Sequence, residues 1–311
     1  MVKRTSLPVS RQTMLYASFA VIYLVWGSSF MASKIMVQYL PVLLATSVRF
    51  LIGGSLLCAI ARLRGESFPL SAREWRHCAV MATLTILMST GVNTYALRVI
   101  PSNQSALLNS SSALWIALLG TLGPGGHRLS PATRTGLALG FIGVGCVLWP
   151  RGGFVTAHLG WQLGIVFGCL CWASGTLYYR SMSPRTPPLM FTAMQMAIGG
   201  LVLLVAGLVT GDAARWSWAP AGLASLAYVA LMSSALGYCA YIWLMRNTTP
   251  ARLGTYGYVN PAIATVLGWA VLGETLSGVQ ILGTLVILAG VTLITVFDTA
   301  RSSAPTAKRA G

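Results

Sequence analysis

Charged residues are scarce in this chain of 311 residues, and acidic residues are scarcest. Only 8% of the residues are charged, with 5 acids against 21 lysines and arginines. A soluble domain carries about 25% charged residues, because its surface faces water. The low charge therefore excludes an ordinary soluble fold. With 55% hydrophobic residues and a mean hydropathy of +0.72, the chain is expected to lie mostly in a lipid bilayer.

The residues needed for redox chemistry, metal binding and ATP hydrolysis are also rare. The 6 cysteines lie in or beside apolar segments and form no CxxC pair, so neither a disulfide framework nor a zinc site is expected. The only lysines are Lys3, Lys34 and Lys308, and none follows a glycine, so the chain has no Walker motif. No basic patch with interleaved aromatics lies outside the apolar segments. We predict no cofactor, no metal and no nucleic-acid partner.

Ten apolar segments are long enough to cross a bilayer, whose core of about 30 Å needs about 20 helical residues. Breaks rich in proline, glycine and charge separate them, and the short loops leave no soluble domain. We predict an all-α polytopic membrane protein with ten transmembrane helices. The predicted spans are 14–32, 42–61, 77–97, 102–122, 134–150, 159–179, 187–209, 219–244, 253–273 and 279–297.

The lysines and arginines divide unequally between the two faces that these spans define. With the N-terminus inside, sixteen fall on the cytoplasmic side and four on the outer side: Lys34, Arg98, Arg151 and Arg215. Arg49 lies within a span. This excess follows the positive-inside rule. We therefore predict a multi-pass protein of the inner (plasma) membrane, with both tails, 1–13 and 298–311, in the cytoplasm.

An internal repeat divides the chain into two halves, 14–150 and 159–297. Shifted by 146 residues, 26–57 aligns with 172–203 without a gap, and ten of 32 positions are identical, Trp26 and Trp172 among them. Each half holds five spans, and because five is odd the second half enters the membrane inverted. Inverted repeats are typical of secondary transporters, which bind substrate near the midplane between the repeats.

Three segments resemble the EamA family of the drug/metabolite transporter superfamily. They read YLVWGSSF (23–30), SVRFLIGG (47–54) and YGYVNPAIATVLGWAVLGETLS (256–277). The resemblance covers about 14–297 and is closest to bacterial inner-membrane exporters of that family, which implies the export direction. Two positions depart from symmetry between the halves. Asn260 and Pro261 correspond to Ala113 and Leu114, and Glu274 corresponds to His127, which puts equal roles for the two repeats in doubt.

Polar and aromatic side chains recur at helical spacing within the spans. Polar residues inside a membrane usually face the bundle interior, so these stripes are expected to converge on one central substrate cavity. The alternative is that the hydroxyls and amides only join helices, and that the tryptophans lie in an interfacial belt. The predicted cavity residues are Trp26, Ser29, Arg49, Ser89, Asn93, Asn109, Ser112, Trp172, Thr176, Gln195, Tyr238, Tyr241, Tyr256 and Asn260.

Two further residues have more than one interpretation. Arg49, whose repeat counterpart is Gln195, either holds a substrate carboxylate or is a structural arginine that snorkels toward the interface or binds carbonyl groups. Pro261 lies in mid-span, where it frees a carbonyl and bends the helix, and we interpret it as a hinge of a gate.

These features predict a secondary, non-ATP transporter that exports small metabolites, such as amino acids or amphipathic drugs, by alternating access. No carboxylate lies at the midplane, so facilitated diffusion or exchange is expected. An uptake or exchange carrier for a sugar-like or nucleotide-like solute remains an alternative, as does a channel or an integral-membrane enzyme. We do not expect an enzyme, because no catalytic constellation lies at bilayer depth. The oligomeric state stays open, and a monomer is one option.

Overall fold

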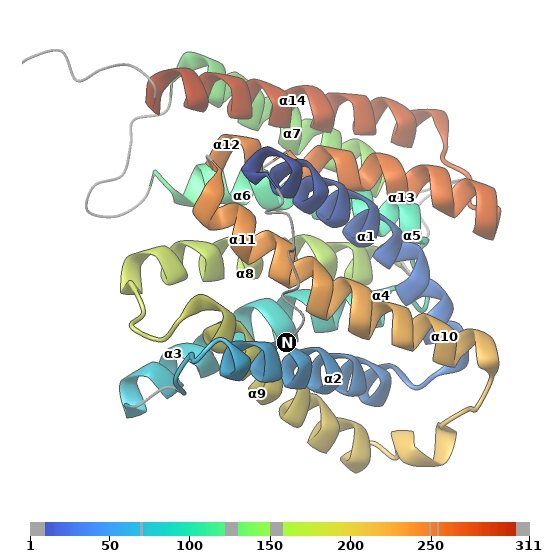
Figure 1. Cartoon of the computed structure of the whole chain (residues 1–311). Coiled ribbons are helices and arrows are strands. Elements are labelled where there is room, and N and C mark those ends of the chain that lie inside the picture. Colours follow the sequence, from blue (N-terminus) through green and yellow to red (C-terminus); the bar gives the residue numbers. More distant parts are fainter. Residues whose placement is uncertain are drawn as a thin grey trace, which may run out of the picture.

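The structure is a computed structural model that describes residues 10–68, 71–121, 130–149, 158–248, 250–253 and 255–302 (Figure 1). The described residues are helical and contain no strand. Most of both predicted tails, His127 and the connection at 150–157 lie outside the described residues.

The helices form ten crossings, five from each half. The first half contains α1 (Arg11–Tyr39), α2 (Val42–Leu63), the continuous α3–η1–α4 (Ala72–Met81, Ala82–Gly91, Val92–Ala96), the broken α5–α6 (Ser102–Asn109, Ser111–Leu119) and α7 (Pro131–Leu148). The second half contains α8 (Leu159–Met182), α9 (Pro188–Val209), the short η3 (Asp212–Arg215), the continuous α10–η4–α11 (Pro220–Tyr228, Val229–Gly237, Tyr238–Asn247), α12 (Pro250–Leu253), α13 (Tyr256–Leu272) and α14 (Gly278–Ser302).

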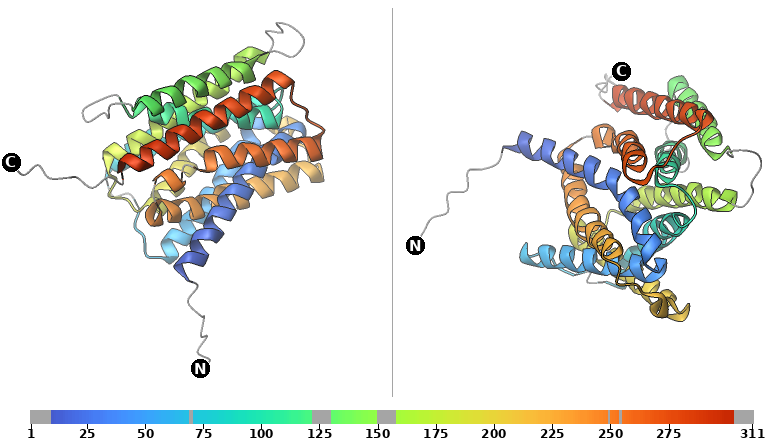
Figure 2. Two further views of the ribbon diagram at one scale, coloured as in Figure 1. Left: turned by 90° about the horizontal axis from the view of Figure 1, so that it is seen from above. Right: turned by 90° about the vertical axis from the view of Figure 1, so that its right-hand side faces the viewer.

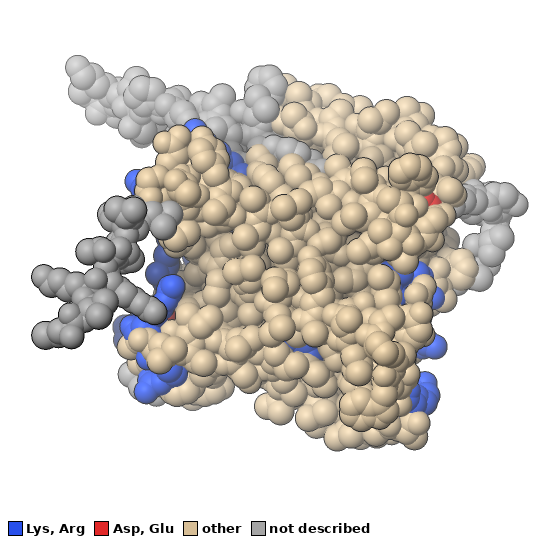
Figure 3. All heavy atoms as spheres, turned by 45° about the vertical axis from the view of Figure 1, so that its right-hand side comes forward, with Lys and Arg blue, Asp and Glu red and all other residues tan. Residues whose placement is uncertain are grey.

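The outer surface of the bundle is suited to lipid. In Figure 3 most basic side chains gather toward the two ends of the molecule, and the broad band between them is nearly free of charge. Large apolar side chains such as Leu24, Val205 and Leu285 are exposed. By length and composition, six of the described helical segments can cross a membrane. The short α5 cannot, but its Ser102, Asn103, Gln104 and Ser105 are buried within the protein.

Contacts between helices follow the internal repeat. α2 packs along α9, and α7 along α14, which are the pairs that the repeat relates to each other (Figure 2). α1 packs on α13 and on α10–η4–α11, and its counterpart α8 packs in the same way on α5–α6 and on η1–α4. α1 begins and α14 ends on the same side of the bundle (Figure 1), which we call the terminal face. The side where α1 ends and α14 begins is the opposite face.

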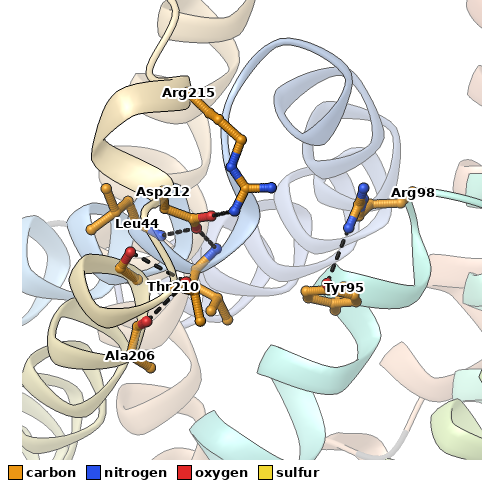
Figure 4. A network of polar contacts seen from close by, with 9 residues as sticks. Leu44, Tyr95, Arg98, Ala206, Thr210, Asp212 and Arg215 are labelled. Atoms are coloured by element: carbon orange, nitrogen blue, oxygen red, sulfur yellow. Dashed lines mark hydrogen bonds and ion pairs between the residues drawn. The ribbon is translucent and has the colours of Figure 1, made fainter.

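Two repeat-related carboxylates bind the helix N-termini of the other half. Asp212 Oδ2 accepts hydrogen bonds from the N–H groups of Leu43 (3.1 Å) and Leu44 (3.4 Å), at the start of α2, and Arg215 pairs with Oδ1 (Figure 4). Glu66 Oε2 accepts one from the N–H of Met190 (3.0 Å), near the start of α9. Helix N-termini leave N–H groups unpaired, so each acid supplies a cap that Pro41 and Pro187 do not. The acid that follows α9 thus binds the start of α2, and the acid that follows α2 binds the start of α9. Each helix therefore starts where the other ends, and the two run antiparallel.

A third carboxylate joins α13 to α5 at the opposite face. Glu274 accepts hydrogen bonds from the Ser102 N–H (2.6 Å), the Ser102 hydroxyl (2.8 Å) and the Asn103 N–H (2.9 Å). The residue before α5 is Pro101, which makes no side-chain cap. Glu274 therefore supplies the N-terminal cap of α5, which Pro101 does not supply.

Glycines let α7 and α14 approach closely. A Cβ atom on Gly143 would lie 2.6 Å from the carbonyl oxygen of Gly283, and one on Gly290 would lie 2.5 Å from that of Gly136. Real Cβ atoms do not come so near to backbone oxygen, so these positions exclude larger residues. The two helices form a closely packed pair at one side of the bundle.

Each half contains a π-helical segment at the same place in its third crossing. η1 begins at Ala82 and η4 at Val229, which are 147 residues apart. In η1 the Thr90 hydroxyl donates to the carbonyl oxygen of Thr85, five residues earlier (3.0 Å), which matches the wider turn. Such segments widen a helix and are frequent at functional sites. Here they carry Ser89 and Thr90 in one half and Ser233 and Ser234 in the other.

Candidate substrate cavity

A cavity of about 160 Å³ lies between the two halves of the bundle. Its walls come from α1, α2, η1–α4 and α5–α6 of the first half, and from α8, η4–α11 and α13 of the second. A protein cavity of about 150 Å³ admits benzene, so this one has room for a small organic molecule. The predicted residues that line it are Trp26, Ser29, Arg49, Ser89, Asn93, Asn109, Ser112, Trp172, Tyr238, Tyr256, Asn260 and Pro261.

Three of the predicted cavity residues do not line it. The Thr176 hydroxyl donates to the Trp172 carbonyl (2.9 Å), within its own helix. Gln195 is buried in α9, and its side chain is two atoms shorter than that of Arg49, its repeat counterpart. Tyr241 lies behind the wall, where its ring is 5.2 Å from that of Trp26 and 6.0 Å from that of Tyr256. These three side chains are not among those that line the cavity in this structure, and a role for them in binding substrate stays a prediction.

Aromatic side chains close the cavity toward the terminal face. The Trp26 ring lies 5.5 Å from the rings of both Tyr238 and Tyr256, and its Nε1 donates to the Ser233 carbonyl (3.1 Å). One turn closer to that face, the hydroxyls of Tyr23 and Thr255 share a hydrogen bond between α1 and the start of α13. These contacts join α1, α11 and α13 on the side of the cavity toward the terminal face.

Toward the opposite face, the lining continues along α1 to Ser33 and along α4 to Leu97. Beside them, Lys34 Nζ donates to the carbonyl oxygens of Leu97 (2.6 Å) and Ile100 (3.0 Å). A lysine at the end of a helix stabilises carbonyl groups that have no helical partner. Lys34 thus connects α1 to the end of α4 where the cavity comes nearest to this face.

Hydrogen bonds hold the polar wall of α4 and α5. The Ser105 hydroxyl donates to the Asn93 Oδ1 (2.6 Å), and the Asn109 amide donates to the Ser105 carbonyl (2.9 Å). The Ser112 hydroxyl donates to the Asn109 carbonyl (2.5 Å), next to the break at Ser110. Asn93 therefore joins α4 to α5, whereas the Asn109 amide bonds within α5, and both residues line the cavity.

Arg49 is held by two serines of η4 and not by an acid. Its Nε donates to the Ser234 hydroxyl (3.0 Å) and its Nη2 to the Ser233 hydroxyl (3.2 Å). The residue is only 7% exposed, and the Phe50 ring centroid is 5.2 Å from the guanidinium carbon. The carbonyl-bound arrangement considered from the sequence does not occur among these contacts, because both partners are side-chain hydroxyls.

Pro261 and Asn260 lie on the cavity wall within α13. Proline has no N–H, so the carbonyl of Gly257, which also lines the cavity, receives no hydrogen bond from position 261. The Asn260 Oδ1 is buried and has no partner among the described residues. The first half has Ala113 and Leu114 at these positions, so it supplies neither feature. A hinge at Pro261 remains a prediction.

Several lining residues were not predicted from the sequence, and two of them, Thr90 and Ser233, lie in the π-helices, whose wider turns change the spacing of side chains. Thr90 and Thr94 line the cavity beside Ser89 and Asn93. The other unpredicted lining residues are Phe30, Ser33, Leu97, Ala106, Ser110, Ser233 and Gly257. The signal for Ser233 was its position next to Ser234 in η4, because Ser234 belongs to a polar stripe of the same span.

The polar chemistry of the cavity consists of one guanidinium, amides, hydroxyls and backbone carbonyls. No Asp, Glu, His or Cys is among the lining residues. The cysteines are all free, and the described residues contain no group of histidines, cysteines and acids that could hold a metal. The arrangement is suited to binding a small molecule, with apolar walls and a few placed polar groups.

Comparison with known families agrees with this architecture. The model of the EamA-like transporter family matches residues 13–149 and again 159–296, once in each half. The chain belongs to the EamA-like transporter family.

Two bacterial relatives of this EamA-like transporter match along nearly their whole length. It is 30% identical over 282 residues to the uncharacterized inner membrane transporter YedA of Escherichia coli K12, covering 90% of both chains. It is 27% identical over 306 residues to the uncharacterized transporter YvbV of Bacillus subtilis, covering 96% of both. The WAT1-related chloroplastic protein At3g02690 of Arabidopsis thaliana is 24% identical over 86% of this chain and 66% of its own.

A solved crystal structure has the same fold. It is superimposed with a TM-score of 0.67 and 19% identity, over 95% of this chain and all of the other. At that identity the match concerns the fold alone. Taken with the family match, the chain is a membrane transporter built from two EamA repeats.

Proposed function

We propose that this chain is a secondary carrier of the inner membrane that exports a small organic solute through its central cavity by alternating access. The observation that carries the proposal is a single cavity with walls from both inverted halves. Two similar halves can exchange conformations, which opens the same cavity first to one face and then to the other. Export, rather than uptake, rests on the resemblance to bacterial exporters alone.

The structure supports one starting point for this cycle. The aromatic cluster of Trp26, Tyr238 and Tyr256 closes the terminal face, and the cavity reaches Leu97 near the opposite face. With the termini in the cytoplasm, as the positive-inside rule favours, the described conformation is closed to the cytoplasm. Because the lining contains no carboxylate, we propose transport down the gradient of the solute or in exchange for another solute, without a proton-carrying acid.

Counterflow in liposomes tests the function. Purified protein in liposomes preloaded with one solute would be offered the same solute in labelled form, using a panel of amino acids, sugars, nucleotides and amphipathic aromatics. A carrier gives saturable uptake, which preloading accelerates. Single-channel currents in a planar bilayer, or no member of the panel moving faster than in protein-free liposomes, would contradict the proposal. Reporter fusions at each terminus test the predicted cytoplasmic location of the tails.

A further inference from the structure

The positive charge of Arg49 has no negative partner in the cavity wall. The guanidinium is at least nine-tenths buried, and its two hydrogen bonds go to the neutral hydroxyls of Ser233 and Ser234. Phe50 offers only an aromatic ring, whose quadrupole does not cancel a full charge. The described acids Glu66, Glu74, Asp212 and Glu274 bind groups at helix ends. Among the side chains that the structure describes, no anion pairs with Arg49.

Arg49 also has hydrogen-bond donors to spare. A guanidinium carries five N–H donors in a planar fork. Two are used by the serines, and no hydrogen bond from Nη1 is found among the described residues. Nη1 is not among the fully buried atoms without a partner, so part of its surface is exposed, and Arg49 is one of the residues that line the cavity. A guanidinium with free N–H groups on a cavity wall is suited to a carboxylate, which accepts two parallel hydrogen bonds.

The rest of the wall suits an apolar body attached to that carboxylate. Trp26, Phe30 and Trp172 present aromatic surface, and Leu97 and Pro261 present aliphatic surface. The hydroxyls and amides nearby are neutral. A ligand with a single positive charge would meet the charge of Arg49 with no acid to balance it.

We propose that the substrate of this cavity is an organic monocarboxylate, whose carboxylate pairs with Arg49 and whose apolar part packs on Trp26, Phe30 and Trp172. This inference rests on the proposed function, because it names the substrate class of the same cavity. It distinguishes among the solutes considered above: it favours carboxylates and disfavours neutral sugars and cationic amphipathic drugs.

The same charge has a consequence for closure of the cavity. Alternating access requires a state in which neither face is open and little water remains. Removing water from an unpaired buried charge is costly, whereas a paired and hydrogen-bonded charge is tolerated. A bound carboxylate thus makes closure easier than it is for the empty cavity. The loaded carrier changes conformation faster than the empty one, so exchange of carboxylates is faster than net movement.

Three probes with one carbon skeleton isolate the effect of charge. 3-Phenylpropanoate, 3-phenylpropanamide and 3-phenylpropylamine are anionic, neutral and cationic at neutral pH. Binding to the full-length protein in nanodiscs would be measured by protection against heat, with empty nanodiscs as a control for partition into lipid. Hydrogen bonds to a charged group contribute about 1.5–3 kcal/mol, so the carboxylate should bind about 10- to 100-fold more tightly than the amide. The amine should bind most weakly.

Variants at Arg49 and a matched variant show where the preference arises. Arg49→Gln should lower the carboxylate-to-amide ratio to near one, and Arg49→Lys should retain part of it, because the charge remains but the fork is lost. Arg64→Gln removes an exposed arginine from the end of the same helix and should leave the ratio unchanged. Protection of Arg49→Gln by the amide would show that the variant is folded.

The wild-type protein alone suffices to overturn the proposal. Equal protection by the acid and the amide, stronger protection by the amine, or no protection by the acid would each refute it. Retention of the carboxylate preference in Arg49→Gln would also refute it. Failure of the transport function is a separate result: the protein would still prefer the carboxylate in nanodiscs, but liposomes would show no counterflow.

Discussion

The cap that Glu274 places on α5 has an effect on stability that can be worked out from its contacts. Glu274→Ala removes three hydrogen bonds, two of them from backbone N–H groups at the start of α5. Loss of a helix cap costs about 0.5–2 kcal/mol, and hydrogen bonds to a charged group are at the upper end of the range for single bonds. We expect a loss of about 3 kcal/mol, which corresponds to a decrease in Tm on the order of 5–8 °C.

Two further variants should lose less stability than Glu274→Ala, in a defined order. Glu274→Gln keeps one acceptor oxygen and should lose about half as much. Glu66→Gln disturbs a carboxylate with one backbone hydrogen bond, to Met190, and should lose least. The assay is thermal unfolding in one detergent, followed by circular dichroism at a fixed heating rate. If Glu274→Ala unfolded at the same temperature as Glu66→Gln, the cap would contribute nothing beyond a surface charge, and the reasoning would fail.

The remaining predictions concern packing and the two ends of the cavity. Gly143→Leu should separate α7 from α14 and lower the Tm by about 2–8 °C, which corresponds to an overpacking cost of about 1–3 kcal/mol; an unchanged Tm would contradict the contact with Gly283. Trp26→Ala removes the ring between Tyr238 and Tyr256, so a cysteine introduced into the cavity wall as Ser89→Cys should react with a thiol probe added from the terminal face faster than it does in Trp26→Phe; equal rates would argue against closure by these rings. Lys34→Met removes the hydrogen bonds to the carbonyls of Leu97 and Ile100, so the rate of amide hydrogen exchange at the end of α4 should rise. An unchanged rate would show that Lys34 is not needed to hold the end of α4 in place.

The fold was largely predictable from the sequence, because its main determinants are local or periodic. Spans of about 20 apolar residues and the Trp26/Trp172 repeat predict ten helices in two inverted halves, and the family match agrees. The location of the cavity follows from the same symmetry. The prediction of its lining depends on the assumption of a regular helix, and it fails where the helix is not regular. Thr90 and Ser233 lie in π-helical segments, whose wider turns no spacing of 3.6 residues anticipates.

Other features depend on contacts between distant residues. The acids Glu66 and Asp212 are 146 residues apart, and the sequence places both in loops, but only the packed structure shows that each caps a helix of the other half. Tyr241 has the helical spacing of a lining residue but is not one of the residues that line the cavity, and its ring packs against those of Trp26 and Tyr256. Gln195 occupies the position of Arg49 in the repeat, yet it does not reach the cavity. Residues at equivalent positions in the two repeats can therefore have different roles.

The exchange of caps between α2 and α9 limits which helices are free to move. Separating these two helices at either face would leave backbone N–H groups of Leu43, Leu44 or Met190 without partners in a membrane protein, where water is scarce to replace them. The pair is therefore expected to keep its geometry while α1 and α8 tilt across it. A crosslink between α2 and α9 should then leave transport intact, whereas one between α1 and α13 should stop it.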